Sequence, residues 1–304
     1  MATFPQWVEG ARPRTWPAAF APVAAGTGAA IHHLGGLDTL TSSTAPLSLA
    51  AVLVRAALAL AVALSLQIGV NYANDYSDGV RGTDDDRVGP FRLTASGAAQ
   101  PGTVKAAAFG SLGAGALFGL VLIAISGIWW TILIGAAAVA AAWFYTGGKK
   151  PYGYLGLGEL FVFVFFGLVA VNGTAYAITG TVPWTALLAS IAIGLLAVAI
   201  MLTNNLRDIP TDAETGKRTL AVRLGDRGTR ALYAASILVP FLLVVPIAWE
   251  HRPVLVTLVA SLLISPPLTA VQRGASGRDL IPVLGQTGRI ELAYSVLLLV
   301  GFLL

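Results

Sequence analysis

Carboxylate and carboxamide side chains gather where a long apolar stretch of the chain ends. The first such cluster reads NYANDYSDGVRGTDDDRVGP and runs from Asn71 to Pro90. Residues spaced three, four and seven positions apart lie on one face of a helix, so the cluster should present a single polar stripe. The members of that stripe, extended by one turn, are Gln67, Asn71, Asn74, Asp75 and Asp78. Oxygen ligands in this arrangement could bind a divalent cation.

A cation site competes here with two other interpretations, a solvated helix end and a hydrogen-bond network between spans. An Asp at membrane depth costs about 3 kcal/mol, and a second carboxylate nearby raises that cost unless a positive charge compensates for it. Mg2+ binds one or two carboxylates and completes its coordination with water and substrate phosphate. The stripe therefore favours a magnesium site for a phosphate-bearing substrate.

A charged loop follows the stripe. Its sequence DDDRVGPFR supplies Asp84, Asp85, Asp86, Arg87 and Arg92, and Gly and Pro interrupt it. Three consecutive Asp residues are typical of a solvated loop, so we take Asp84 alone of the three as a candidate ligand.

A second cluster, in MLTNNLRDIPTDAETGKRTLAVRLG, repeats the pattern of Asn followed by two Asp residues. It contains Asn204, Asn205, Asp208 and Asp212. Proline cannot continue a regular helix and restricts the residue before it, so Pro210 predicts that the helix closes near Asp208 and that Asp212 lies past the break. Two acidic clusters should then open on one face of the membrane.

Basic side chains flank the second cluster at Arg207, Lys217, Arg218 and Arg223. A topology-setting loop would explain these bases but not the repeated Asn and Asp pattern. Four carboxylates, two Mg2+ ions and a diphosphate sum to about three negative charges, which the bases can offset, and two metal ions stabilise a leaving oxygen in this way. The clusters therefore predict diphosphate chemistry.

The segment YTGGKKPYGYLGLGE combines aromatic and basic side chains with glycines. Lys149 and Lys150 suit a phosphate group, whereas Tyr145, Tyr152 and Tyr154 can stack on an aromatic substrate or form hydrogen bonds with it. Glycines would let the backbone approach a ligand closely. An aromatic belt at the membrane interface, with two topology-setting lysines, is the alternative.

The composition places these clusters in a membrane protein. Of 304 residues, 56% are hydrophobic and 11% are charged, which leaves too little polar surface to cover a soluble globule. The N-terminal segment lacks the apolar core and cleavage site of a signal peptide, so we expect it to be retained. The absence of Cys excludes disulfides, thiolate nucleophiles and Cys-ligated metals.

Apolar stretches of roughly 17 to 25 residues predict an all-α polytopic membrane protein with nine transmembrane helices, or eight if the short last one does not cross. The expected spans are 16–34, 46–72, 104–125, 128–146, 157–180, 184–206, 230–249, 253–272 and 289–304. Short and long links alternate between them. We expect these spans to form one domain over residues 1–304.

The Lys and Arg residues orient the spans. All 19 except Arg55 and Arg252 lie before the first span, in the long loops or within the first two residues of the span that follows a long loop, so these regions and the N-terminus should be cytoplasmic. All three His residues then lie on the outer side, and chemistry at the acidic clusters must proceed without His. We expect a multi-pass protein of the bacterial inner (plasma) membrane whose active site lies on the cytoplasmic side.

The ordered set of motifs resembles the UbiA superfamily of intramembrane aromatic prenyltransferases over nearly the whole chain. The set consists of the Asn- and Asp-rich motif, a Tyr-x-x-x-Lys loop and an Asp-x-x-x-Asp motif, in this order along the chain. The segments ARPRTWPAA, NYANDYSDGVRGTDDDRVGPFR, YTGGKKPYGYLGLGE and GKRTLAVRLG look like the branch that prenylates 1,4-dihydroxy-2-naphthoate in menaquinone biosynthesis. The implied fold is a helical bundle around a central cavity that opens to the cytoplasmic face and to lipid.

Carried over residue by residue, the resemblance implies roles for the site residues. The implied metal ligands are Asn74, Asp78, Asp84, Asp208 and Asp212, and Asp75 on the helical stripe is a further candidate that binds metal directly or through another ligand. Asp84 would replace the Asp that the commonest spacing puts where Gly82 stands, with Asp85 or Asp86 as alternatives. The implied catalytic residues are Asn74, Asp78, Tyr145, Lys149, Asp208 and Asp212. Those implied for the diphosphate are Arg87, Lys149, Lys150, Arg207, Lys217 and Arg218, and those for the acceptor are Asn71, Tyr145 and Tyr152.

The resemblance also implies a reaction and its partners. Two Mg2+ ions would help a polyprenyl diphosphate lose its diphosphate, so that an allylic cation forms. The ring of 1,4-dihydroxy-2-naphthoate would attack that cation and lose its carboxylate as CO2, giving demethylmenaquinone. A dry cavity would protect the cation from water. Membrane lipid is a further expected partner, and nucleic acid is not.

Two alternatives stay open. Within the same chemistry, the acceptor could be 4-hydroxybenzoate or another aromatic compound. A divalent-cation or secondary transporter is the alternative of a different class, because repeated halves with intramembrane polar residues also occur in transporters. Transporter sites lie near the membrane midplane, however, whereas these acids gather at one face. The segment DGVR also suggests a CDP-alcohol phosphotransferase, but the rest of that motif is missing.

Overall fold

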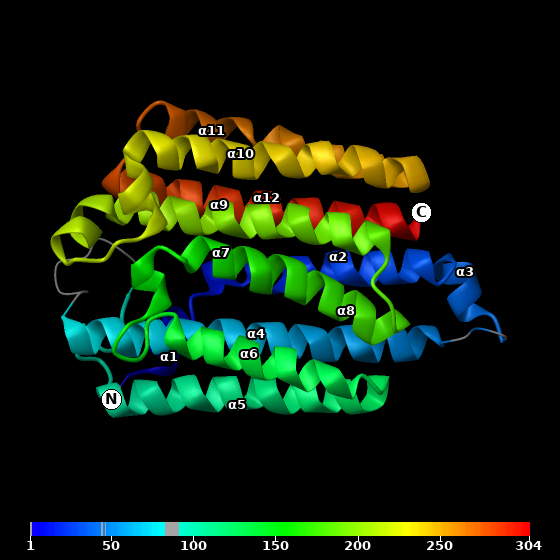
Figure 1. The fold of residues 1–304 in the computed structure, drawn as a ribbon, viewed down its shortest axis with the longest axis horizontal. Coiled ribbons are helices and arrows are strands. Elements are labelled where there is room, and N and C mark those ends of the chain that lie inside the picture. The colour runs from blue at the N-terminus through cyan, green and yellow to red at the C-terminus, as the bar shows by residue number, and fades with distance from the viewer. Residues whose placement is uncertain (1, 44, 46, 83–90) are drawn as a thin grey trace.

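The computed structural model describes residues 2–43, 45, 47–82 and 91–304, and long helices that run along one axis form most of it (Figure 1). On one side lie α9 (Trp184–Glu214), α10 (Leu220–Glu250) and α12 (Leu280–Leu303), and on the other lie α4 (Leu49–Arg81), α5 (Pro101–Ser126) and α6 (Ile132–Phe144). Between these sides lie α2 (Pro17–His33) and a helix made of α7 (Gly158–Val162), a π-helical segment (Phe163–Val169) and α8 (Ala170–Thr179).

Short elements connect these helices. They are α1 (Phe4–Gly10), α3 (Gly36–Thr41), α11 (Ser265–Gln272) and the 3-10 segments Pro13–Thr15, Trp129–Thr131, Tyr152–Leu155, Arg252–Leu263 and Gly277–Asp279. The segments around 13–15, 152–155 and 215–219 lie at the same end of the bundle as the ends of α4 and α9, so they can contribute to one site there.

The described helices make a multi-pass membrane protein. Six of them are long and apolar enough to cross a membrane, and a seventh span results if Arg252–Leu263 and α11, bent by 45°, are counted together. The two other predicted spans correspond to α2, which has 17 residues, and to the short apolar helix Trp129–Phe144. Nine spans therefore stays a prediction, because these two helices are shorter than an ordinary crossing requires.

The polar stripe belongs to the last turns of α4. This helix begins after Ser48, whose Oγ accepts the backbone N–H of Ala51 at 3.3 Å. It ends at Gly82, which adopts a φ of 70° that favours glycine. Because the helix continues to Arg81, all of the stripe from Asn71 to Asp78 is helical, as the spacing predicts.

The prediction that Pro210 ends the helix is wrong. Helix α9 continues through Pro210 to Glu214, although a proline inside a helix removes one hydrogen bond and costs about 3 kcal/mol. The buried packing of the long apolar part of α9 offsets this local cost, and Thr211 Oγ1 donates to the Asp208 carbonyl at 3.1 Å. Asp208 and Asp212 therefore lie one turn apart on one continuous helix.

One predicted span begins too late, because the helix expected from 289 begins at Leu280. Helix α10 begins at Leu220 but is interrupted at Gly225 (φ 67°, ψ 177°), so the predicted span 230–249 lies in the part of α10 that follows this break. Hydropathy locates the apolar part of a helix but not its hydrogen-bonded ends. At α10 those ends hold polar residues with partners, since buried Arg230 pairs with Asp226 at 2.7 Å.

Glycines let the central helices approach closely. A Cβ on Gly26 of α2 would lie 2.4 Å from the Val171 carbonyl oxygen, and a Cβ on Gly167 would lie 2.6 Å from the Cα of Gly194 on α9. Small residues at helix contacts allow this backbone approach in membranes. They hold the α7–α8 helix against α2 and α9, which leaves its other face free to line a cavity.

Candidate active site

A cavity of about 1030 Å3 lies between α2, α4, α5, α6, the α7–α8 helix and α9. Its charged end lies where α4 and α9 end and is lined by Asp78, Arg92, Arg207, Asp208, Asp212 and Lys217. From there the lining continues along α4 as far as Ala59. At 1.5 Å of rise per residue, the distance from Asp78 to Ala59 is roughly 28 Å, close to the thickness of a bilayer core.

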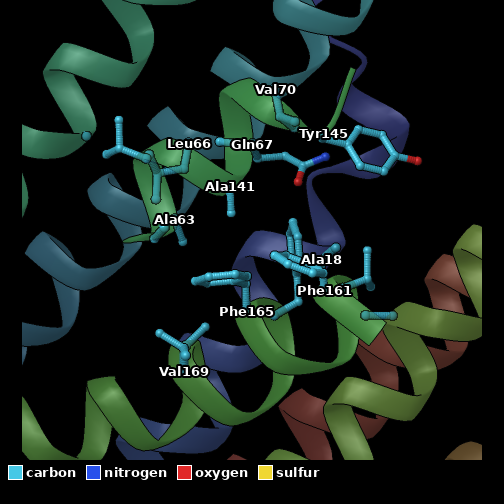
Figure 2. Close-up of a pocket in the computed structure, with 18 of the residues that line it drawn as sticks. Ala18, Ala63, Leu66, Gln67, Val70, Ala141, Tyr145, Phe161, Phe165 and Val169 are labelled. Carbon is cyan, nitrogen blue, oxygen red and sulfur yellow. The ribbon is translucent and has the colours of Figure 1, made fainter. Parts of the chain in front are cut away.

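The rest of the wall is mainly apolar (Figure 2). Ala63 and Leu66 of α4 line one part of it, and Phe161, Phe165 and Val169 line another. The last three residues are four positions apart and so share one face of the helix that contains the π segment. Such a wall suits a long hydrocarbon chain.

The two acidic clusters converge at the charged end of the cavity. The Nζ atom of Lys217 lies 3.8 Å from Oδ1 of Asp78 and 4.0 Å from Oδ1 of Asp212. Asp78 belongs to the last turns of α4 and Asp212 to those of α9, and both side chains are buried. One ammonium group therefore contacts carboxylates from both motifs.

Tyr154 stabilises this arrangement. Its hydroxyl group donates a hydrogen bond of 2.6 Å to Oδ1 of Asp78, and Nζ of Lys217 lies 4.7 Å from the centroid of its ring. The Tyr154 carbonyl accepts the backbone N–H of Arg218 at 3.0 Å. Sequence reasoning did not predict Tyr154 as a partner of Asp78. The available signal was its place in the Tyr- and Lys-rich loop.

Two further guanidinium groups line the charged end. Arg207 donates to both carboxylate oxygens of Asp208, at 2.7 and 2.9 Å, and both side chains are buried. Arg92, also buried, has NH2 3.7 Å from Oδ2 of Asp78. The structure thus brings predicted Arg207, Asp208 and Lys217 together with Arg92, to which we had assigned no role.

Asp75 has a structural role, and its role as a metal ligand stays a prediction. Oδ2 accepts the backbone N–H of Leu93 at 2.7 Å, and Oδ1 accepts that of Thr94 at 2.8 Å. The residue is buried and does not line the cavity. Both oxygens therefore hold the segment after 91 against α4, which positions the neighbouring Arg92.

The amides of the stripe attach the N-terminal segment to α4. Gln67 Nε2 donates to Thr15 Oγ1 at 2.8 Å, and Asn71 Nδ2 donates to Thr15 Oγ1 at 3.1 Å and to the Ala11 carbonyl at 3.0 Å. Thr15 in turn donates to the carbonyl of Arg12, the one non-glycine residue with positive φ (54°) among the described residues. Arg12, Thr15, Gln67 and predicted Asn71 all line the cavity, so this network forms part of its wall.

Asn74 also lines the cavity, and the hydroxyl of Thr146 donates to its Oδ1 at 2.7 Å. An amide oxygen has two lone pairs, so this bond leaves one for another partner. Asn74 thus keeps the capacity to be a metal ligand.

The predicted tyrosines lie on the cavity wall as hydrogen-bond donors. Burial raises the pKa of Tyr152, so its hydroxyl stays protonated at neutral pH. Tyr152 donates to the Ala141 carbonyl at 2.8 Å, and its ring stacks on Phe161 at 4.0 Å between centroids.

Several predicted residues are not brought to the cavity. Lys149, Lys150 and Arg218 have exposed side chains and do not belong to its lining. Outside the described residues lie Asp84, Asp85, Asp86 and Arg87. The roles expected for these seven residues therefore stay predictions.

The donor atoms at the charged end suit Mg2+. Asp78, Asp208 and Asp212 supply carboxylate oxygens, and Asn74 supplies an amide oxygen. In the described part of the chain, no three acidic or His side chains form a group that could hold a metal by themselves. Mg2+ commonly binds one or two carboxylates plus substrate phosphates, and the ammonium of Lys217 already shows that these acids hold positive charge. The residues fit a Mg2+ ion that a diphosphate helps to bind.

Comparisons with known proteins show which family and which fold this chain resembles. Residues 18–279 match the model of the UbiA prenyltransferase family. A 1,4-dihydroxy-2-naphthoate octaprenyltransferase of Mycobacterium tuberculosis is 52% identical over 302 residues, which covers 97% of this chain and 96% of the relative. Among solved structures, a UbiA homologue from Aeropyrum pernix K1 gives a TM-score of 0.68 at 17% identity, over 93% of this chain and 96% of that one. A UbiA homologue from Archaeoglobus fulgidus bound to DMAPP and Mg2+ gives a TM-score of 0.60 at 16% identity, over 96% of this chain and 99% of that one.

Proposed function

The chain belongs to the UbiA prenyltransferase family, and we propose that it transfers a polyprenyl group from a polyprenyl diphosphate to 1,4-dihydroxy-2-naphthoate in menaquinone biosynthesis. The observation that carries the proposal is the convergence of Asp78 and Asp212 on Lys217 at one end of a long apolar cavity. The relative's acceptor favours naphthoate over 4-hydroxybenzoate. The position of the acids at helix ends favours an enzyme over a transporter.

The charged end of the cavity would bind the diphosphate. Arg92, Arg207 and Lys217 line it and are each paired with a carboxylate. An incoming diphosphate would bind the same cations as the acids do. These cations would then offset the negative charge of the diphosphate as well as that of the carboxylates. Guanidinium groups bind phosphate oxygens in pairs, so Arg92 and Arg207 would also orient the donor.

Asp78, Asp208 and Asp212 would hold Mg2+ together with the diphosphate oxygens. Bound there, the ion stabilises the negative charge that develops on the leaving diphosphate. We expect two ions, with Asn74 and Asp84 as further ligands.

The remaining residues would guide the transfer. Cleavage of the C1–O bond leaves the electron pair on the diphosphate and forms an allylic cation. The ring carbon that bears the carboxylate forms the new C–C bond, and loss of CO2 returns an electron pair to the ring, giving the hydroquinone form of demethylmenaquinone. The π faces of Tyr145, Tyr152 and Phe161 would stabilise the cation, and the apolar walls would exclude water from it.

The apolar part of the cavity would hold the polyprenyl tail. Its length along α4, roughly 28 Å, accommodates several isoprene units, and a longer tail would extend into the surrounding lipid. Asn71, Tyr145 and Tyr152 would contact the aromatic acceptor. With the Lys- and Arg-rich loops in the cytoplasm, the charged end would face the cytoplasmic side of the bacterial inner membrane.

A product assay tests this function. Purified protein receives a polyprenyl diphosphate, Mg2+, and 1,4-dihydroxy-2-naphthoate and 4-hydroxybenzoate in competition. We expect the hydroquinone form of demethylmenaquinone, CO2 and diphosphate in equal amounts. Prenylation of 4-hydroxybenzoate instead, or turnover that persists after divalent ions are chelated, would contradict the proposal.

A further inference from the structure

A buried carboxyl group lies directly behind the cavity wall. Glu159, in the first turn of α7, is 4% exposed and does not line the cavity. Its Oε1 accepts a hydrogen bond of 2.8 Å from Nδ2 of Asn205, which does line it. Within the described residues, Oε2 is buried without a hydrogen-bond partner. Burying such a group costs free energy, and structures retain such costs most often at functional sites.

The bond from Asn205 to Glu159 determines which end of the amide faces the cavity. The hydrogen bond runs from the NH2 group of Asn205 to Oε1 of Glu159, so the amide nitrogen is the end that faces the carboxyl group. The amide is planar, and its oxygen therefore points away from the carboxylate. Because Glu159 lies behind the wall and Asn205 lies on it, Oδ1 of Asn205 is left to the cavity. No described residue donates a hydrogen bond to this oxygen.

The neighbouring wall supplies a hydrogen-bond donor. Gly158 brings the start of α7 against Tyr145 and α9, because a Cβ on Gly158 would lie 3.3 Å from the Tyr145 ring and 2.5 Å from Cε of Met201. Met201 is one helical turn before Asn205 on α9. The hydroxyl of Tyr145 and the amide oxygen of Asn205 thus belong to one patch of the wall, which offers one donor and one acceptor.

We propose that Glu159 is a positioning residue: it turns the amide oxygen of Asn205 into the cavity, where this oxygen accepts a hydrogen bond from a hydroxyl group of the aromatic acceptor. This inference rests on the proposed function and specifies how the acceptor is recognised. Diphosphate and carboxylate oxygens have no hydrogen to donate to Asn205 Oδ1. The patch therefore selects a hydroxylated ring, and a site built for a substrate hydroxyl discriminates strongly against an analogue that lacks it.

The test compares two variants of similar size. Glu159→Gln keeps an oxygen that accepts from Asn205, whereas Glu159→Leu removes it. For each, kcat and KM are measured for both substrates, and inhibition constants are measured for 1-hydroxy-2-naphthoate and 4-hydroxy-2-naphthoate, each of which lacks one hydroxyl. Asp38→Asn, at an exposed position on α3, is the control for handling and folding.

We expect Glu159→Leu to raise the KM for the dihydroxy acceptor about tenfold and to leave the KM for the polyprenyl diphosphate unchanged, since one hydrogen bond to the acceptor is lost. It should also lose the wild-type preference for the dihydroxy acceptor over one of the two analogues. Glu159→Gln should recover most of the lost affinity. Asn205→Ala should reproduce the effect of Glu159→Leu, and the double variant should add little to it.

Three outcomes would overturn the inference. One is a Glu159→Leu enzyme with wild-type constants for the acceptor and its analogues. Another is a parallel rise of both KM values with discrimination intact, which indicates a purely structural role. If Glu159→Leu does not fold, Asn205→Ala replaces it as the test. The third outcome is then an Asn205→Ala enzyme that keeps the wild-type preference for the dihydroxy acceptor over both analogues. If the wild-type enzyme does not prenylate 1,4-dihydroxy-2-naphthoate at all, both the proposed function and this inference are overturned. The product assay described above reveals that case before any variant is made.

Discussion

The hydroxyl group of Tyr154 donates a hydrogen bond of 2.6 Å to Oδ1 of Asp78 and so joins the loop after α6 to the last turns of α4. The face of the same ring lies 4.7 Å from Nζ of Lys217, which also contacts Asp212. Tyr154 therefore orients an acid from the first motif and a base beside the second. Its position makes it a sensitive probe of the site.

Tyr154→Phe should lower the apparent affinity for Mg2+ by 10- to 100-fold, the usual loss when a partner that orients a metal ligand is removed. The variant keeps the ring under Lys217 and loses only the hydrogen bond to Asp78. The measurement is the Mg2+ concentration that gives half-maximal activity. An unchanged value would show that Asp78 does not depend on this hydroxyl for its orientation.

Asp78→Asn should lower kcat at least about 100-fold, because it removes negative charge from the position where both motifs meet. Release of diphosphate measures the effect, and size-exclusion chromatography in detergent verifies the fold. Asp38→Asn is a matched control, since that carboxylate is exposed on α3. Wild-type turnover in Asp78→Asn would mean that the charged end of the cavity is not the site of diphosphate release.

Asp75→Ala should destabilise the protein without changing its requirement for Mg2+. The change leaves the backbone N–H groups of Leu93 and Thr94 without their acceptors, and each loss costs about 1–3 kcal/mol where the group is buried. Thermal unfolding in detergent should show a lower midpoint. Asp75→Asn keeps one acceptor oxygen, so its unfolding midpoint should lie between those of the wild type and Asp75→Ala. A shift in the Mg2+ dependence of either variant would instead support Asp75 as a metal ligand.

Ala63→Phe should select against long donors. Ala63 lines the apolar part of the cavity, roughly 22 Å from Asp78 along α4, so a phenyl ring there obstructs a long tail and spares a short one. We expect kcat/KM to fall about tenfold for a long polyprenyl diphosphate and to stay constant for geranyl diphosphate. Ala57→Phe, at an exposed position outside the cavity lining, is the control. Equal losses for both donors would place the tail elsewhere.

Part of the site could be predicted from helical spacing. Asn71, Asn74 and Asp78 recur at intervals that put them on one face of a helix, and in the structure all three line the same cavity. Asp75 has the same spacing and points to the backbone of Leu93 and Thr94 instead. Spacing determines which side chains share a broad face of the helix. The neighbours packed against that face determine which partner each side chain contacts.

Loops and breaks were harder to predict. Lys149 and Tyr154 belong to one loop, and only the path of that loop over the ends of α4 and α9 brings Tyr154 to Asp78 while Lys149 stays exposed. Pro210 obeys a local rule that predicts a helix end, yet the packing of α9 carries the helix past it. In both cases long-range contacts outweighed a local preference.

The amino-acid sequence by itself determined that the chain is a helical membrane protein and that its acids lie at helix ends, because hydropathy and helical periodicity are local properties of the chain. Only the tertiary structure decided that Asp78 and Asp212 meet at Lys217 and that Glu159 holds the amide of Asn205. These pairs are far apart in the chain. Their contacts depend on the rotation and depth of each helix against its neighbours, which close packing of many side chains sets together.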